Sequence, residues 1–170
     1  MTARIVPARG RDAPALARLC RDEVEMGLGW RWRPGAIARL IARPEVEVAL
    51  ALLGEERVGF GVMELGPEDA ELLLFAIDPR HRRQGVGTAL LRYLETEAAQ
   101  AGLRNVWLHV RADNVAALEF YERSGYRVDG FLRAHYAGRE DALRLVHALT
   151  QAEAEPVELP DLASLLRGGP

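Results

Sequence analysis

Apolar and polar positions along this 170-residue chain alternate in some stretches with the period of a strand and in others with the period of a helix. A nearly continuous apolar run at 70–77, AELLLFAI, predicts a buried central strand. The run at 104–111, RNVWLHVR, alternates and predicts a strand with two different faces. Between them, at 88–101, apolar residues recur every three or four positions, which predicts an amphipathic helix. This succession of strand, helix and strand indicates a mixed α/β fold.

Turn-forming residues separate these segments and define the rest of the order. Asp12 is expected to cap a helix with Pro14 near its start, and Gly102 is expected to close the helix at 88–101. Residues 133–140, RAHYAGRE, are predicted to form a loop or a hairpin. The predicted strands cover 3–7, 45–53, 58–65, 70–77, 104–111, 126–132 and 141–149, and the predicted helices run from near residue 12, over 35–42, over 88–101, and from 113 or 114 to about 123.

The C-terminal stretch differs from the rest of the chain. Residues 1–150 carry the alternating pattern and are predicted to form one domain, whereas 151–170, QAEAEPVELPDLASLLRGGP, are acidic and contain several prolines. Such a composition is typical of a flexible tail. The alternative is a short helix that docks on the domain or on a partner through Leu159, Leu162, Leu165 and Leu166.

Composition narrows the class of protein. Nearly half of the residues are hydrophobic, which indicates a globular chain, and the formal net charge of −3 gives no overall positive field for nucleic acid. Cys20 is the single cysteine, so neither a disulfide framework nor a multi-cysteine metal site is expected. The N-terminal stretch lacks the apolar segment of a signal peptide, and no stretch reaches the roughly 20 apolar residues of a membrane span. We therefore expect a cytoplasmic protein that binds neither nucleic acid nor membrane.

The segment HRRQGVGTALL, 81–91, joins the predicted central strand to the long helix. The first N–H groups of a helix lack helical acceptors, and the helix dipole favours anions there. Gly85 and Gly87 leave the backbone open, and Arg82 and Arg83 add positive charge, so one interpretation is a phosphate or pyrophosphate site. The other is a plain turn that needs glycine for its backbone angles. A Walker loop is excluded because the chain has no lysine, and a dinucleotide fingerprint needs a third glycine.

Two motifs together favour the first interpretation. The spacing Arg82-x-x-Gly85-x-Gly87 resembles the Arg/Gln-x-x-Gly-x-Gly/Ala signature of the GCN5-related N-acetyltransferase (GNAT) family. A second family signature is similar to a later set of residues, Asn114, Ala117, Phe120, Tyr121, Gly125 and Tyr126. The resemblance covers about 3–149 and leaves the C-terminal stretch unexplained. It implies a single-domain GNAT fold, an α/β fold with a mixed, mostly antiparallel sheet of about seven strands flanked by about four helices.

The resemblance implies that acetyl-CoA is the acyl donor and that no metal is needed. The pyrophosphate would lie on the backbone amides of 83–88, and the pantetheine arm would pair like an extra strand with the backbone of 75–77. The strands at 70–77 and 104–111 are expected to splay apart and leave a slot for that arm. The implied cofactor-binding residues are Phe75, Ala76, Ile77, Arg82, Arg83, Gln84, Gly85, Val86, Gly87, Thr88, Asn114, Ala117 and Tyr121.

The resemblance also suggests catalytic residues. Tyr121 matches the family tyrosine that faces the CoA sulfur, so we expect it to act as the general acid toward the departing thiolate, with simple core packing as the alternative. His109 lies where relatives that acetylate ribosomal proteins usually have a glutamate base. An imidazole suits the removal of a proton from an amine, although a strand histidine can also be purely structural. Glu64 and Glu71 are reserve bases, and Asn114 can cap a helix as well as contact CoA.

The acceptor side is suggested by the segment HYAGREDALRLV, 135–146, which resembles the end of acetyltransferases that modify ribosomal-protein N-termini. In this family the loop between the first two helices and the hairpin before the last strand line the acceptor groove. The implied acceptor-binding residues are Glu25, which would meet the amine, and Trp30, Trp32 and Tyr136, which would wall the groove. The alternative for the tryptophans is that they hold the loop on the core. Arg31 and Arg33 either suit an acidic acceptor or are simply solvated.

The favoured function is therefore acetyl transfer from acetyl-CoA to a primary amine, most of all the N-terminal α-amine of a peptide or protein. Two alternatives stay open. The first is a GNAT enzyme that acetylates a small amine, such as an amino acid, a polyamine or a drug. The second is an acyl-CoA-binding sensor without catalysis. The expected assembly is a monomer or a homodimer.

Overall fold

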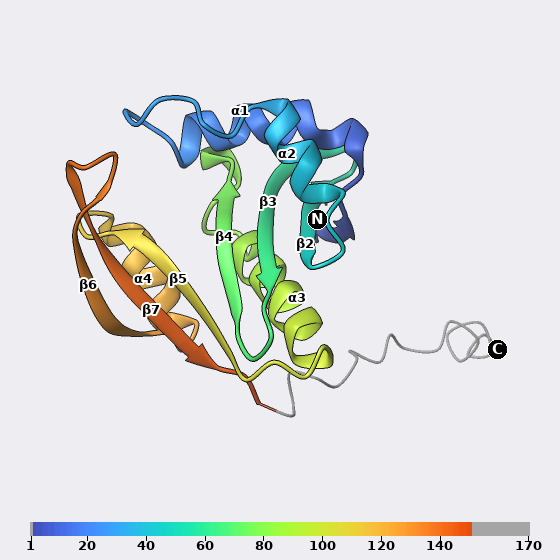
Figure 1. The fold of residues 1–170 in the computed structure, drawn as a ribbon. Helices are drawn as coiled ribbons and strands as arrows, with labels where there is room; N and C mark the ends of the chain where they lie inside the picture. The colour runs from blue at the N-terminus through green and yellow to red at the C-terminus, as the bar shows by residue number, and fades with distance from the viewer. Residues whose placement is uncertain (1, 151–170) are drawn as a thin grey trace.

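The structure of the protein is a computed structural model, and it describes residues 2–150. The two predictions for 151–170, a flexible tail and a docked helix, lie outside the described residues. One seven-stranded sheet runs through the molecule in the order β1-β2-β3-β4-β5-β7-β6 (Figure 1). Its strands are β1 (Arg4–Pro7), β2 (Val46–Leu53), β3 (Glu56–Leu65), β4 (Ala70–Ile77), β5 (Asn105–Arg111), β6 (Arg127–Tyr136) and β7 (Glu140–Ala148), and the α-helices are α1 (Ala13–Glu23), α2 (Pro34–Ile41), α3 (Val86–Gln100) and α4 (Val115–Arg123). The expected α/β fold is confirmed.

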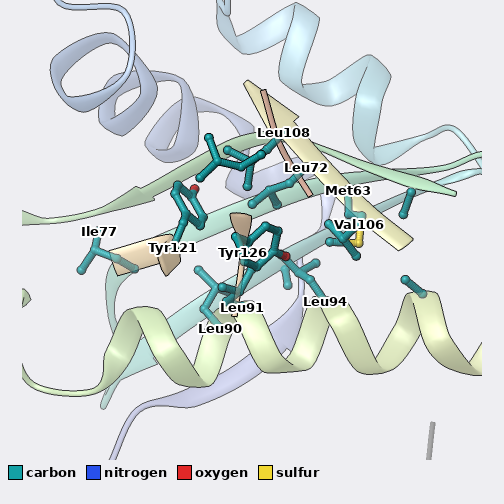
Figure 2. Close-up of a cluster of buried hydrophobic side chains, with 14 of the residues drawn as sticks. Met63, Leu72, Ile77, Leu90, Leu91, Leu94, Val106, Leu108, Tyr121 and Tyr126 are labelled. Atoms are coloured by element: carbon teal, nitrogen blue, oxygen red, sulfur yellow. The ribbon is translucent and has the colours of Figure 1, made fainter. Parts of the chain in front are cut away.

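Helices cover both faces of the sheet and divide the core in two. On one face, α1 and α2 pack on β2, β3 and β4, and residues such as Leu16, Ile37 and Phe60 are fully buried between them (Figure 1). On the other face, α3 and α4 enclose a second cluster (Figure 2). Figure 2 labels its members Met63, Leu72, Ile77, Leu90, Leu91, Leu94, Val106, Leu108, Tyr121 and Tyr126. Within residues 2–150, no helix has both the length and the apolar character needed to cross a bilayer.

The pairing of β4 with β5 is short, and this feature positions the site. Every other neighbouring pair in the sheet is antiparallel, whereas β4 and β5 run parallel and pair only at Ala70 with Val106 and Glu71 with Trp107. Beyond Glu71 the two strands separate, as Figure 1 shows. The expected splay between these strands is confirmed, and it leaves one edge of β4 without a partner strand within the described residues.

The start of α1 differs from the prediction. Asp12 stands at the N-cap position, but its side chain makes no capping hydrogen bond. The carboxylate instead accepts a hydrogen bond from the backbone N–H of Arg9 (2.8 Å) and forms an ion pair with Arg57 (2.6 Å). Asp12 is almost fully buried, so its negative charge needs a partner. The Arg57 guanidinium provides this partner, which a capping hydrogen bond alone would not.

The C-terminal hairpin extends further than predicted. The segment 133–140 was expected to be a loop or a hairpin, and the structure has a hairpin there, but β6 continues beyond the predicted end at 132 to Tyr136, and only three residues separate it from β7. The continuation needs an irregular step, because the register shifts between Leu132 and Tyr136 and Ala134 has a positive φ of 51°. The carboxylate of Asp141 accepts the backbone N–H of Ala134 at 2.8 Å and stabilises this step. The alternating pattern could not reveal it, because a bulge interrupts the period of two.

A buried hydrogen bond joins α3 to the hydrophobic core. The hydroxyl of Tyr126 donates to the carboxylate of Glu95 at 2.8 Å, and both side chains are nearly inaccessible. We expect Tyr126→Phe to lower the free energy of unfolding by about 1.5–3 kcal/mol, because it removes a buried hydrogen bond to a charged group. Urea denaturation measures this loss. Tyr93→Phe is the matched control, since its hydroxyl lies at 3.5 Å from Glu47 on a half-buried surface and should contribute much less. Equal losses for both variants would contradict the prediction.

Candidate active site

The loop that precedes α3 exposes its backbone. Gly85 stands at the N-cap with φ of 80°, and Arg83 also has a positive φ of 62°. No atom lies within 4 Å of the place that a Cβ on Gly85 would take, so the backbone is open on that side. The N–H groups of Val86, Gly87 and Thr88 begin the helix and have no helical acceptor. Together they form the kind of amide cradle that binds an anionic group.

Hydrogen bonds hold this loop in place from behind. The Nε of Arg82 donates to the carbonyl of Ile77 at 3.0 Å, and its guanidinium pairs with Glu23 of α1. The side-chain amide of Gln84 donates to the carbonyl of Arg80 at 3.1 Å. Two of the predicted cofactor-binding side chains therefore support the loop, and what the loop offers to a ligand is mainly its backbone.

A pocket of about 840 Å³ opens beside this cradle, between α3, α4 and the end of β4. Most of the predicted cofactor-binding residues line it. Val86 does not, because its side chain is buried in the core, and Gln84 does not, because its side chain turns back to Arg80. The predicted residues brought together at the pocket are Phe75, Ala76, Ile77, Arg82, Arg83, Gly85, Gly87, Thr88, Asn114, Ala117 and Tyr121.

Sequence reasoning missed part of the pocket's charge. Arg92 and Arg123 line it together with Arg83, so cationic side chains from the loop, α3 and α4 meet there. The signal for Arg92 was available, because it lies one helical turn after Thr88 on the same face of the long helix. The position of Arg123 depends on how α4 packs, which no local pattern reveals. Their combined field favours a ligand with several phosphate groups.

Asn114 performs the cap that was expected as one of its roles. Its side-chain oxygen accepts a hydrogen bond from the backbone N–H of Ala117 at 3.2 Å and so begins α4. The amide nitrogen is not used by this cap, and the residue also lines the pocket.

Tyr121 lines the pocket with an almost fully buried side chain. Its ring lies 6.3 Å from that of Phe75 and 5.2 Å from that of Phe120, measured between centroids. The ring of Tyr126 lies at 5.5 Å (Figure 2). Burial is the main cause that raises the pKa of Tyr121 well above its usual value, and the nearby Tyr136 and Glu95 raise it further. The hydroxyl therefore keeps its proton at neutral pH. Among residues 2–150 it has no hydrogen-bond partner, so it is available as a donor to a bound group.

His109 lies in a cluster of charged and aromatic side chains. Its ring centroid is 4.5 Å from that of His135 and 5.3 Å from that of Trp107, and Arg144 of β7 stands opposite it in the sheet. Burial lowers the pKa of His109, and His135 and Arg144 lower it further, while Asp129 of β6 opposes them. The imidazole is therefore neutral near neutral pH and able to accept a proton.

His135 was missed as a member of this cluster because the preceding strand was expected to end at 132. The irregular step at Ala134, held by Asp141, lets His135 reach across β7 to His109. Tyr136 follows it, at 4.9 Å between the two ring centroids. The pKa of Tyr136 is raised, chiefly by burial.

Tyr121 and His109 are on opposite faces of the sheet. Leu108 packs in the same core cluster as Tyr121 (Figure 2), and His109, the next residue along the strand, points to the other face. A substrate can therefore reach both side chains only where β4 and β5 are not paired, beyond Glu71 and Trp107.

Two of the predicted acceptor residues in the α1–α2 loop, Glu25 and Trp30, form hydrogen bonds within the protein. Glu25 is only 8% exposed, and its carboxylate accepts the backbone N–H groups of Arg31 (2.7 Å) and Trp32 (3.2 Å). The indole N–H of Trp30 donates to the carbonyls of Ala17 (3.2 Å) and Trp32 (3.1 Å). Both side chains therefore help to fix the conformation of the loop.

Arg111, which was not among the predicted site residues, joins the acceptor-side segments. Its guanidinium donates to the carbonyls of Val24 (3.1 Å) and Met26 (2.9 Å) in the α1–α2 loop. It also forms an ion pair with Glu140 (3.1 Å) of β7 and lies 5.9 Å from the ring centroid of Tyr136. The loop and the hairpin are thus held at the end of β5, on the same face as His109.

Glu71 stands where β4 and β5 begin to separate. It is paired with Trp107 across the parallel ladder, so its side chain shares the face of His109. Burial raises the pKa of Glu71, Glu64 raises it further, and Arg144 lowers it. A half-buried carboxylate in this place is a reasonable second base or a partner for a cationic amine.

Comparison with known proteins identifies the family. Residues 16–126 match the sequence model of the Acetyltransferase (GNAT) family. The chain therefore belongs to the GNAT acetyltransferase family.

Similar proteins include an alanine N-acetyltransferase that is named for a ribosomal protein. The ribosomal protein bS18-alanine N-acetyltransferase of Escherichia coli (strain K12) is 39% identical over 87 residues, and the match covers 49% of this chain and 59% of that relative. The matched stretch is thus less than two thirds of the relative. The crystal structure of the ribosomal-protein-S18-alanine N-acetyltransferase from Escherichia coli superposes with a TM-score of 0.76 and 25% identity, covering 93% of this chain and 99% of that one. A putative streptothricin acetyltransferase from Bacillus anthracis str. Ames, solved in complex with acetyl coenzyme A, gives a TM-score of 0.61 and 27% identity over 66% of this chain and 67% of that one.

Proposed function

We propose that this protein transfers the acetyl group of acetyl-CoA to the N-terminal α-amine of a peptide or protein. The observation that carries the proposal is the separation of β4 from β5 beside the amide cradle of α3, with Tyr121 on one side and His109 on the other. The similarity to the Escherichia coli enzyme supports a protein α-amine as the acceptor. A cytoplasmic location belongs to the same proposal, because the relative is named for a ribosomal substrate.

The residues present fit acetyl-CoA. The amides of Val86, Gly87 and Thr88 suit its pyrophosphate, Arg83, Arg92 and Arg123 suit its phosphate charges, and the partnerless edge of β4 can accept an extended amide-containing arm. These features support it as the cosubstrate. When bound, it supplies an acetyl group that is activated as a thioester.

The proposed reaction needs no covalent enzyme intermediate. His109 removes a proton from the substrate ammonium, and the amine nitrogen then forms a bond with the acetyl carbon while the carbon–sulfur bond breaks. Tyr121 donates its proton to the departing sulfur and regains, through solvent, the second proton that the nitrogen loses as the amide forms. His109 then releases its proton to solvent. Positioning of the two substrates in one site supplies a large part of the rate.

The test is incubation of the protein with acetyl-CoA and a mixed panel of short peptides and small amines, followed by mass spectrometry. We expect acetylated α-amines and untouched internal lysines. The chain has no lysine, so self-acetylation of side-chain amines does not confuse the products. Absence of acetylated peptides, with CoA still bound, would overturn the proposal.

A second candidate function is acetylation of a small-molecule amine. The specific observation for it is the likeness to a protein named a streptothricin acetyltransferase. In the same experiment, acetylated small amines without acetylated peptides would favour this candidate.

The cradle gives a separate prediction. We expect Gly85→Ala to weaken CoA binding by about five- to tenfold, because the positive φ of 80° strains any residue with a Cβ and the relaxed loop turns its amides away. Isothermal titration calorimetry with CoA measures the change. Gly54→Ala is the matched control, because Gly54 also has a positive φ, of 59°, and open space around it, but lies in the β2–β3 turn. Equal affinities for the two variants would show that the Gly85 backbone does not bind CoA.

A further inference from the structure

A cluster of arginines lies on α2 and the loop before it. Residues 26–44 contain Arg31, Arg33, Arg39 and Arg43 and no acidic residue, in a chain whose formal net charge is −3. We call these four residues the arginine surface. Arg31, Arg39 and Arg43 line a shallow pocket of about 470 Å³, and Trp32 forms one of its walls.

Tryptophan rings support two of these guanidinium groups. Arg31 lies over Trp32, at 5.3 Å from the ring centroid, and Arg33 lies over Trp30 at 5.3 Å. Trp30 is itself fixed by the two hydrogen bonds of its indole N–H. The planar groups are therefore partly preorganised, so less side-chain entropy is lost when an anion binds them.

The charge of this surface is only partly compensated. Arg43 forms ion pairs with Glu45 (2.7 Å) and Glu64 (2.5 Å). Arg31, Arg33 and Arg39 have no carboxylate partner among residues 2–150. Three exposed cations with ring supports and no internal anion are suited to a negatively charged ligand.

The arginine surface is connected to the proposed acceptor side. Glu25 binds the backbone N–H groups of Arg31 and Trp32, and Arg111 of β5 binds the loop carbonyls next to Glu25. In Figure 1 the α1–α2 loop extends from above β4 toward the β6–β7 hairpin, and α2 follows it over the same face of the sheet. A polypeptide whose amine lies near His109 can therefore leave the site past this surface.

We infer that the arginine surface binds acidic side chains of the acceptor polypeptide, downstream of the amine that is acetylated. This inference rests on the proposed function and adds a substrate class to it. A carboxylate fits the small pocket, and the fork of a guanidinium group matches its two oxygens. An extended nucleic acid is disfavoured, because it needs a longer basic stripe than one loop and one short helix provide.

The first experiment measures binding apart from turnover. Two fluorescein-labelled, N-acetylated peptides are compared by anisotropy, identical except that one has three glutamates after its first residues and the other has three glutamines. We expect the glutamate peptide to bind about three- to tenfold more tightly, since exposed charge pairs contribute modestly to affinity. This advantage should disappear in about 0.5 M salt, because salt screens exposed charge pairs. The double variant Arg31→Gln/Arg39→Gln should remove the preference. Arg4→Gln/Arg127→Gln, which removes two exposed arginines elsewhere on the fold, should keep it.

The second experiment measures kcat/KM for the same peptide pair with free α-amines. We expect the preference to appear in KM and to vanish in Arg31→Gln/Arg39→Gln, with the affinity for CoA unchanged. Equal binding of the two peptides to the wild-type protein would overturn the inference. Tighter binding of a single-stranded RNA oligonucleotide through the same two arginines would also overturn it. If the glutamate peptide binds selectively but no peptide is acetylated, the proposed function fails while the acidic-peptide site stands.

Discussion

Replacement of Tyr121 by phenylalanine is expected to lower kcat by about 100-fold, because the reaction loses its proton donor to the departing sulfur. The hydroxyl is well placed for this effect, since it is protonated, lines the pocket and has no competing partner among the described residues. The affinity for CoA should change little, because the ring remains and still packs against Phe75 and Tyr126. Steady-state kinetics with a peptide that carries a free α-amine, together with calorimetry for CoA, separates the two quantities.

Tyr93→Phe is the control for this measurement. Tyr93 is a half-buried tyrosine of α3 that does not line the pocket, and burial raises its pKa to about 12. Its loss should leave kcat unchanged. An unchanged kcat in Tyr121→Phe would remove Tyr121 from the mechanism and leave it as a core residue.

The second large effect concerns His109. We expect His109→Gln to lower kcat/KM by about 100-fold near neutral pH, because the amine then has no positioned base. The pH profile of kcat/KM shows whether the essential group acts as a base or as an acid. A base works in its neutral form, so activity falls as the pH drops through the pKa of His109. Because burial and the neighbouring cations lower that pKa below 6.5, the wild-type enzyme should keep its activity below pH 6.5.

His135 provides an independent test of the same assignment. His135→Asn removes one of the groups that lower the pKa of His109, so the acid limb of kcat/KM should move to higher pH while the plateau stays. Arg144 and Asp129 remain in both proteins, and Glu71 still faces the site from β4. Arg133→Gln, which removes a positive charge from the same strand without contact to His109, should leave the limb in place. If the acid limb survives in His109→Gln, the base is another group, and Glu71 becomes the candidate.

The fold was largely predictable from periodicity. The runs at β4, α3 and β5 each show one clear period, and their bounds in the structure differ from the predicted ones by at most two residues. The end of β6 was not predictable, because the step at Ala134 depends on a tertiary hydrogen bond from Asp141. Asp12 was misjudged for a related reason, since its partner Arg57 is 45 residues away.

Site residues that belong to one sequence motif were predictable, whereas those brought together from distant parts of the chain were not. Motif residues such as Gly85 and Tyr121 lie together at the pocket as the resemblance implied. Arg111 and His135 were missed, because each acts across elements that no sequence spacing relates. Glu25 and Trp30 have hydrogen-bond partners within the loop and α1 that a sequence cannot show, and their role toward the acceptor stays a prediction.

The short pairing of β4 with β5 has a consequence for local opening of the sheet. An inner strand with one unpartnered edge should exchange its amide hydrogens with solvent faster than a strand paired on both sides. Hydrogen–deuterium exchange should therefore distinguish the two ends of β4. Ala70 and Glu71 should be protected in the free protein, whereas amides at 72–77 that face the gap should become protected only when a ligand completes the sheet. The bound cosubstrate would then pair with β4 in the place of a neighbouring strand. Its dissociation would lower the local stability of the middle of the sheet.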